Sequence, residues 1–224
     1  MEILRPLGMT DDMWVFLSED DEFNKAVNIL ETKVGEIFPP KENIFNAFKN
    51  CSHPRDIRVM IFAQDPYPNI DAHGFAISQN PLSNRTTPPT LVTILKTLKK
   101  QGFIDQDHKG TTLELWSCKG IILLNTYLTI QADKKPHTFW LAYTRRLVQK
   151  IARLNSVIFL LWGNVASKLL EKTILTSNKN SLILKTTHPS PLAQNSLKEV
   201  DKFYNINHFK ICSEIIGDDN LWKL

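Results

Sequence analysis

Four short apolar runs alternate with helical patterns along this chain. The runs cover residues 57–63, 120–125, 156–162 and 182–187, and each leads into a loop that starts with Pro, Gly, Asn or His or contains one of them. Short, continuous apolar runs bounded by such residues are typical of strands that are buried on both faces. Strands alternating with helices favour a parallel sheet covered on both sides. We therefore predict an α/β fold, a three-layer αβα sandwich with a central four-stranded parallel sheet.

Five segments around these strands show helical spacing. The first runs from Glu22 to Ile37 with apolar residues at close to a 3.6-residue period, and Pro39-Pro40 ends it. The other four start near Pro89, cover Phe139 to Arg153, begin at Asn164, and run from about Asn205 to Ile216. The stretch from Gln79 to Pro89 is rich in Asn, Ser, Thr and Pro, and we interpret it as a functional loop.

Size and charge leave several classes of protein open. A chain of 224 residues fits one domain, residues 1–224, and a chain of this length buries roughly 70% of the surface that its unfolded form exposes. The 27 Lys and Arg residues exceed the 23 Asp and Glu residues by four. This mildly basic balance does not by itself identify nucleic acid as a partner.

Cysteines and apolar segments indicate an intracellular protein. Cys51, Cys118 and Cys212 are odd in number and far apart, so they predict reduced thiols rather than a disulfide framework or a zinc site. Residues 1–8 lack the apolar stretch of a signal peptide, and no membrane-spanning run occurs. We expect no membrane contact, and a cytoplasmic location in a prokaryote or a nuclear one in a eukaryote or virus. A monomer is expected, because no heptad pattern calls for self-association.

Polar signatures follow three of the apolar runs. Gln64-Asp65-Pro66-Tyr67 comes after the first run, Asn125 ends the second, and His188-Pro189-Ser190-Pro191-Leu192 comes after the fourth. Open α/β sheets bind ligands at the carboxyl ends of their strands. We therefore expect these three signatures to converge on one crevice.

Eight blocks along most of the chain, in this order, resemble the uracil-DNA glycosylases of the ubiquitous first family. They are residues 38–40 with 44–48, Gln64-Asp65-Pro66-Tyr67, Ala72-His73-Gly74, Pro88-Pro89-Thr90-Leu91, residues 123–126 with 128–129, Leu160-Leu161-Trp162-Gly163, residues 188–192, and Phe203 with His208-Phe209. The resemblance implies hydrolysis of the N-glycosidic bond of uracil flipped out of DNA, which leaves an abasic site in base excision repair. It implies neither a metal nor an organic cofactor.

The chemistry of such a reaction agrees with the residues present. Breaking a C1′–N bond through an electron-poor sugar calls for a nearby negative charge and a positioned water, which Asp65 can supply. The leaving uracil carries charge on O2, and His188 can donate a hydrogen bond to it; the resemblance implies that the neutral ring does so. The amide of Asn125 complements O4 and N3–H of uracil, whereas cytosine presents the reverse pattern.

The resemblance also implies substrate contacts at Gln64 and Tyr67, whose ring would crowd the C5 position and exclude thymine. Structural readings remain open: Asp65 as a turn residue, His188 bonded to a backbone carbonyl, and Asn125 as a bridge between strand ends. Contacts to DNA phosphates are expected from small polar groups and helix starts, and an apolar wedge from Leu192. The phosphate-contact residues are Pro88, Pro89, Thr90, Gly163, Asn164, Ser190 and Pro191.

The chain departs from the family pattern near the expected pocket. Ala63 replaces a Gly, Pro68-Asn69 replaces His-Gly, and the segment from Tyr67 to Gly74 is one residue shorter. Ile77 stands where the family has a Phe that stacks on uracil. Two alternatives therefore stay open, a glycosylase for a modified pyrimidine and a DNA-binding replication-accessory protein with vestigial catalysis. The expected partner is uracil-containing DNA, single- or double-stranded, while a protein inhibitor or replication partners remain open.

Overall fold

A parallel sheet forms the centre of the computed structural model, which describes residues 2–154, 156–178 and 181–224. Its strands are β2 (Val59–Ala63), β3 (Ile121–Asn125), β5 (Ile158–Trp162) and β6 (Leu182–Thr186). They lie in the order β3-β2-β5-β6, and all three pairings are parallel. Two further strands, β1 (Ile37–Phe38) and β4 (Ile130–Gln131), form a separate antiparallel pair.

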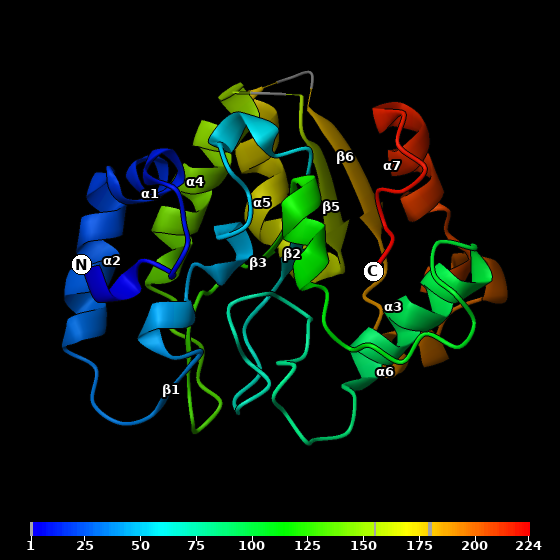
Figure 1. Cartoon of the computed structure of the whole chain (residues 1–224), viewed down its shortest axis with the longest axis horizontal. Helices are drawn as coiled ribbons and strands as arrows, with labels where there is room; N and C mark the ends of the chain where they lie inside the picture. Colours follow the sequence, from blue (N-terminus) through cyan, green and yellow to red (C-terminus); the bar gives the residue numbers. More distant parts are fainter. Residues whose placement is uncertain (1, 155, 179–180) are drawn as a thin grey trace.

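Helices cover both faces of the sheet (Figure 1). They are α1 (Asp11–Ser18), α2 (Asp21–Glu31), α3 (Pro89–Lys100), α4 (Trp140–Leu154), α5 (Asn164–Ser177), α6 (Pro191–Asn195) and α7 (His208–Ile216). Short 3-10 helices cover Glu2–Leu4, Lys41–Asn43, Asn46–Phe48, Pro54–Asp56, Glu114–Lys119, Glu199–Asp201 and Phe203–Asn205. No helix in the described part of the chain is both long and apolar enough to cross a membrane.

Alternation along the strands divides the core into two layers. Met60 and Phe62 of β2 pack with α1, α2, α4 and α5, whereas Val59 and Ile61 pack with α3, α7 and the C-terminal residues. Successive side chains of a strand point to opposite faces, so a fully apolar strand supplies both layers. The predicted three-layer αβα sandwich with a four-stranded parallel sheet is therefore confirmed.

The first predicted helix is wrong at its C-terminal end. The helix α2 stops at Glu31, where the Thr32 hydroxyl donates to the carbonyl of Ile29 at 2.7 Å and closes the last turn. Val34 fits the apolar period but is 88% exposed, and Ile37 lies in β1. The last predicted helix is also shorter, because residues 203–205 form a 3-10 turn before α7 begins at His208.

The strand β6 is less buried than its apolar sequence predicts. It is the edge strand beside β5, and its residues are half-buried or exposed. Lys185 of this strand forms a 2.8 Å ion pair with Glu171 of α5, so polar contacts cover part of this edge. The three cysteines are free, with Cys51 and Cys212 buried and Cys118 exposed, as predicted.

Candidate active site

The strand ends bring the three polar signatures to one edge of the sheet. β2 and β3 pair in register up to Ala63 and Asn125, and the next backbone N–H, that of Thr126, donates to the carbonyl of Ala63 at 2.9 Å. On the other side, the N–H of Gly163 after β5 donates to the carbonyl of Thr186 at 2.8 Å. The residues that follow these strands therefore surround a common opening, as predicted.

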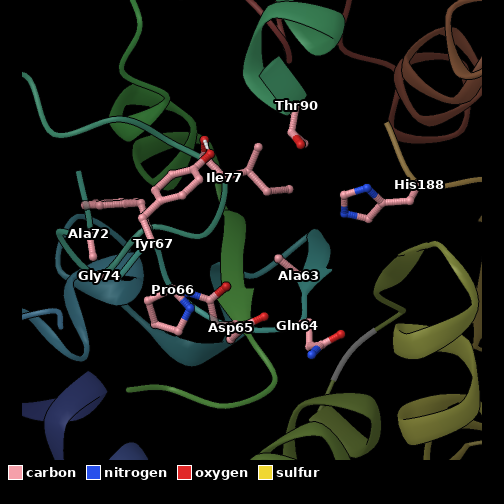
Figure 2. A pocket seen from close by; sticks show the side chains of 12 residues that line it. Ala63, Gln64, Asp65, Pro66, Tyr67, Ala72, Gly74, Ile77, Thr90 and His188 are labelled. Carbon is pink, nitrogen blue, oxygen red and sulfur yellow. Dashed lines mark hydrogen bonds between the residues drawn. The ribbon is translucent and has the colours of Figure 1, made fainter. Parts of the chain in front are cut away.

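A cavity of about 290 Å³ lies at this opening. Figure 2 shows the His188 ring entering from one side, with Ile77 and Tyr67 opposite and Asp65 nearby. The lining residues are Ala63, Gln64, Asp65, Pro66, Tyr67, Ala72, Gly74, Phe75, Ile77, Thr90, Asn125 and His188. All six residues that the sequence assigns to catalysis or base recognition are among them.

Asp65 is half-buried two residues after the end of β2, between exposed Gln64 and buried Pro66. Burial raises the pKa of the Asp65 carboxyl above its ordinary value. A raised pKa makes the carboxylate a stronger base toward water than an ordinary surface aspartate. Asp65 thus combines access to the cavity with enhanced basicity.

One nitrogen of the His188 ring, Nδ1, accepts a hydrogen bond from the backbone. Its Nδ1 lies 3.1 Å from the backbone N–H of Ser190, which donates to it. Burial lowers the pKa of the His188 imidazole, which favours the neutral ring. Because Nδ1 is the acceptor, the proton of the neutral ring is on Nε2. The sequence left open a structural role in which His188 bonds a backbone carbonyl, but the partner of Nδ1 is a backbone N–H.

Asn125 ends β3 as a buried residue in the cavity wall. Its Oδ1 atom is buried and has no hydrogen-bond partner among the described residues. Buried polar groups in native structures are nearly always paired. The cavity therefore presents an acceptor oxygen that suits a donor from a bound ligand.

Tyr67 and Ile77 form one wall of the cavity. The Tyr67 hydroxyl donates to the carbonyl of Ile77 at 2.8 Å, and this bond holds the ring in place. Burial raises the pKa of Tyr67, and the nearby charge of Asp71 adds to this shift. Ile77 has a φ of +69°, a strained conformation for a β-branched residue. Such strain is typical of residues placed by a functional site rather than by local preference.

The predicted functional loop is attached to this wall. Asp71 is buried, its Oδ1 accepts a bond from Nε2 of Gln79 at 3.1 Å, and its Oδ2 lies 3.3 Å from Nε of Arg85. The Gln79 amide also donates to the carbonyl of Arg85 at 3.0 Å. The segment between Gln79 and Pro89 is therefore held to the segment that follows Tyr67.

The residues predicted to contact DNA lie around the cavity rather than in it, apart from Thr90. Pro88 is buried, whereas Pro89 and Asn164 are exposed where α3 and α5 begin. Gly163 precedes α5, and the Ser190 hydroxyl accepts a bond from the backbone N–H of Ala193 at the start of α6. Pro191 is exposed beside Leu192, which is 86% exposed. Leu192 is thus free to contact another molecule.

Phe75 is a lining residue that received no role from the sequence. It is buried, and its ring centroid lies 5.3 Å from that of His73. It directly follows the Ala72-His73-Gly74 block, which was the available signal. Within the described residues, no group of three His, Cys, Asp or Glu side chains could hold a metal ion, and the expectation of metal-free chemistry stays a prediction.

Comparison with known proteins identifies the family. The family described as the uracil DNA glycosylase superfamily matches residues 51–209. The uracil-DNA glycosylase of Francisella tularensis subsp. novicida is 37% identical over 195 residues, which cover 84% of this chain and 83% of the relative. The uracil-DNA glycosylase of Borrelia hermsii is 34% identical and covers 88% of this chain and 87% of the relative.

Solved structures share the fold. The mimivirus UNG variant Y322F in complex with UGI has a TM-score of 0.80 at 25% identity, covering 100% of this chain and 90% of that chain. Mimivirus uracil-DNA glycosylase has a TM-score of 0.73 at 24% identity, covering 95% and 89% of the two chains. With the family match and the relatives above, these findings show that this chain belongs to the uracil DNA glycosylase superfamily.

Proposed function

We propose that this protein hydrolyses the N-glycosidic bond of uracil flipped out of DNA and leaves an abasic site, as a step of base excision repair. The observation that carries the proposal is the unpartnered Oδ1 of Asn125 in a cavity shared with Asp65 and His188. The cavity of about 290 Å³ is at the lower end of the range, about 300–1,000 Å³, of small-molecule sites. That size suits one nucleobase.

Asn125 distinguishes uracil from cytosine. Its Oδ1 accepts the N3–H of uracil, and its amide NH₂ donates to O4. Cytosine offers a lone pair at N3 and an amino group at C4, so both contacts become mismatched. A buried site that hydrogen-bonds its ligand strongly rejects an analogue that leaves the polar groups of the site unpaired. The proposed selectivity therefore depends on one amide at the end of β3.

Tyr67 restricts what can occupy C5 of the base. Its ring lines the cavity and is fixed through the 2.8 Å bond to Ile77. A ring that cannot move aside leaves no room for the thymine methyl group. The same restriction speaks against a pyrimidine with a bulky C5 substituent as the substrate.

Asp65 and His188 act on opposite sides of the bond that breaks. The Asp65 carboxylate polarises the attacking water and counters the positive charge that develops on the sugar. The His188 Nε2–H donates to O2 of the departing uracil, where negative charge accumulates. One such donor is worth roughly 3–4 kcal/mol of transition-state stabilisation. Asp65 comes from the loop after β2 and His188 from the loop after β6, the strands on either side of β5.

DNA binds over the rim of the cavity. Leu192 enters the space that the flipped base leaves in the DNA. Gln64 is exposed in the cavity lining, where it can make a further contact with the substrate. The starts of α3, α5 and α6 present backbone N–H and hydroxyl groups to the phosphates. The proposal takes residues 1–224 as one domain that acts as a monomer inside the cell.

The experiment is base release from a single-stranded oligonucleotide with one uracil, detected as alkali-sensitive cleavage on a denaturing gel. Matched strands carry thymine, cytosine or hydroxymethylcytosine, and Asp65→Asn protein is the control. Cleavage at uracil alone by the wild type, with loss in Asp65→Asn, is expected. Release of another base points to a modified-pyrimidine enzyme, and tight DNA binding without release of any base points to an accessory protein.

A further inference from the structure

A second cavity lies beside the active site, between α3, α6 and the 3-10 helix Phe203–Asn205. Its volume is about 270 Å³, and α3 contributes Thr93 and Lys96 to its wall. Asn195 comes from α6, while Lys202 and Tyr204 come from the segment that follows. In Figure 1, α3 and α6 are adjacent on the side of the sheet where the strand ends open. None of these residues has a role in the proposed reaction.

Both helices connect this cavity to the rim of the active site. Thr90 lines the active-site cavity, and Thr93 and Lys96 follow at three-residue steps along α3. Residues three apart are neighbours on a helix surface, and the six residues from Thr90 to Lys96 span about 9 Å. On the other wall, Pro191 precedes the exposed Leu192. A strand that leaves the active site between these helices passes this cavity within a few nucleotides.

The cavity is positively charged. Lys96 is exposed and forms no ion pair with a described residue. Lys202 pairs with Glu199 at 2.8 Å and lies 5.9 Å from the centre of the Tyr204 ring. Lys100 reaches the same ring at 5.2 Å. Two ammonium groups thus flank the Tyr204 ring, and Lys96 lines the same cavity. Glu199 pairs with Lys202 only.

Gln194 joins this cavity to the catalytic histidine. Its side chain is buried in the cavity wall, and Nε2 donates to the carbonyl of His188 at 2.5 Å. Its Oε1 accepts the backbone N–H of Phe203 at 2.7 Å. The wall is therefore fixed relative to both His188 and the segment that holds Lys202. A group bound here lies at a set position relative to the active site.

We propose that this cavity binds a backbone phosphate of the DNA strand on one flank of the flipped nucleotide, with Lys96 as its main charged contact and Lys202 as a second. The inference rests on the proposed function, which places a DNA strand on this face. Lys96 and Lys202 are the charged residues of the cavity. Phosphate is the anion that such lysines meet first beside a DNA-binding rim, and Lys binds it as a point charge.

The test measures how DNA affinity depends on salt. Binding of a uracil-containing single strand is measured from low to high salt in the Asp65→Asn background, which keeps the strand intact. Each phosphate contact on single-stranded DNA contributes about 0.7 to the slope of log K against log salt. Lys96→Gln is expected to reduce the slope by about that amount, and Lys202→Gln by the same or less. Lys172→Gln, which removes an exposed charge from α5, is expected to leave it unchanged.

Shortened strands locate the contact. Oligonucleotides are shortened separately on the 5′ and 3′ sides of the uracil. The reduction of the salt slope by Lys96→Gln is expected to disappear when the strand is shortened on one of the two sides, and to persist when it is shortened on the other. An unchanged slope in Lys96→Gln, an equal loss in Lys172→Gln, or an effect that survives both trims would overturn the proposal. Uracil release by the wild-type protein is measured in parallel, so failure of the proposed function is seen independently of failure of the phosphate site.

Discussion

The backbone N–H of Ser190 donates to Nδ1 of His188 at 3.1 Å, two residues away along the chain. This bond assigns the proton of the neutral imidazole to Nε2, the atom that faces the substrate in the proposed reaction. A protonated ring would carry a hydrogen on Nδ1 and would oppose the Ser190 N–H. The loop after β6 therefore selects both the charge state and the tautomer of His188.

The pH dependence of activity follows from this arrangement. The proposed reaction needs a neutral His188 and an ionised Asp65. Burial lowers the pKa of His188, so the neutral form persists below the ordinary histidine value of about 6.5. Burial raises the pKa of Asp65, so its protonation also reduces activity only as the pH falls. We expect kcat/KM to be constant from pH 8 down to about 6.5 and to decline below it. A decline already between pH 8 and 7 would contradict the neutral histidine.

Replacing Ile77 by Phe is expected to tighten binding of the flipped base. Stacking of a base on an aromatic ring is worth about 1–3 kcal/mol, which corresponds to roughly tenfold to a hundredfold in affinity. The φ of +69° at Ile77 is costly for any residue with a bulky side chain, and both Phe and Leu remove only the part of that cost that comes from the branch at Cβ. Ile77→Leu is therefore the matched control, because it removes the branch without adding a ring. Affinity for a uracil strand in the Asp65→Asn background gives the comparison, and equal affinities of the two variants would refute stacking.

The contacts of Asp71 predict a graded loss of stability. Asp71→Ala removes one acceptor of the Gln79 amide together with the ion-pair partner of Arg85, and is expected to lower the free energy of unfolding by about 1–3 kcal/mol. Arg85→Gln is expected to cost less than about 1 kcal/mol, because Arg85 is 58% exposed and its ion pair is screened by solvent. Urea unfolding of both variants measures the difference. Equal losses would mean that the ion pair, rather than the amide bond, holds the loop.

Most of the fold could be predicted from the sequence, because apolar runs and helical periods are local signals. The exposure of β6 could not, since it depends on which strand becomes the edge of the sheet. The end of α2 was missed because exposed Val34 happens to continue the apolar period. The helix α1 was not predicted, although Thr10 caps it by accepting the N–H of Met13. A short helix with a weak apolar face leaves little pattern to detect.

The site was predictable where a residue ends a strand or lies within two residues of its end. Asp65, Asn125 and His188 meet because parallel strands end at one edge, and this geometry needs no knowledge of the loops. The positive φ of Ile77 and the bond from Gln194 to His188 involve segments whose course depends on the whole fold. The cavity between α3 and α6 has the same origin, since its two walls are about a hundred residues apart in sequence.

Gly163 is expected to control the position of His188. It has a φ of +92° and a ψ of 164°, and a Cβ at this position would lie 3.0 Å from Cβ of His188. Gly163→Ala therefore adds backbone strain of about 1–3 kcal/mol, and its Cβ displaces the His188 side chain. A displacement near 1 Å can reduce a rate by about a hundredfold, so kcat on a saturating uracil strand is expected to fall by roughly ten- to a hundredfold. Gly217→Ala is the matched control, because Gly217 has a φ of +71° but no atom within 4 Å of the added Cβ. That variant should lose stability and keep kcat, whereas equal kcat values in both variants would show that contact with Gly163 does not position His188.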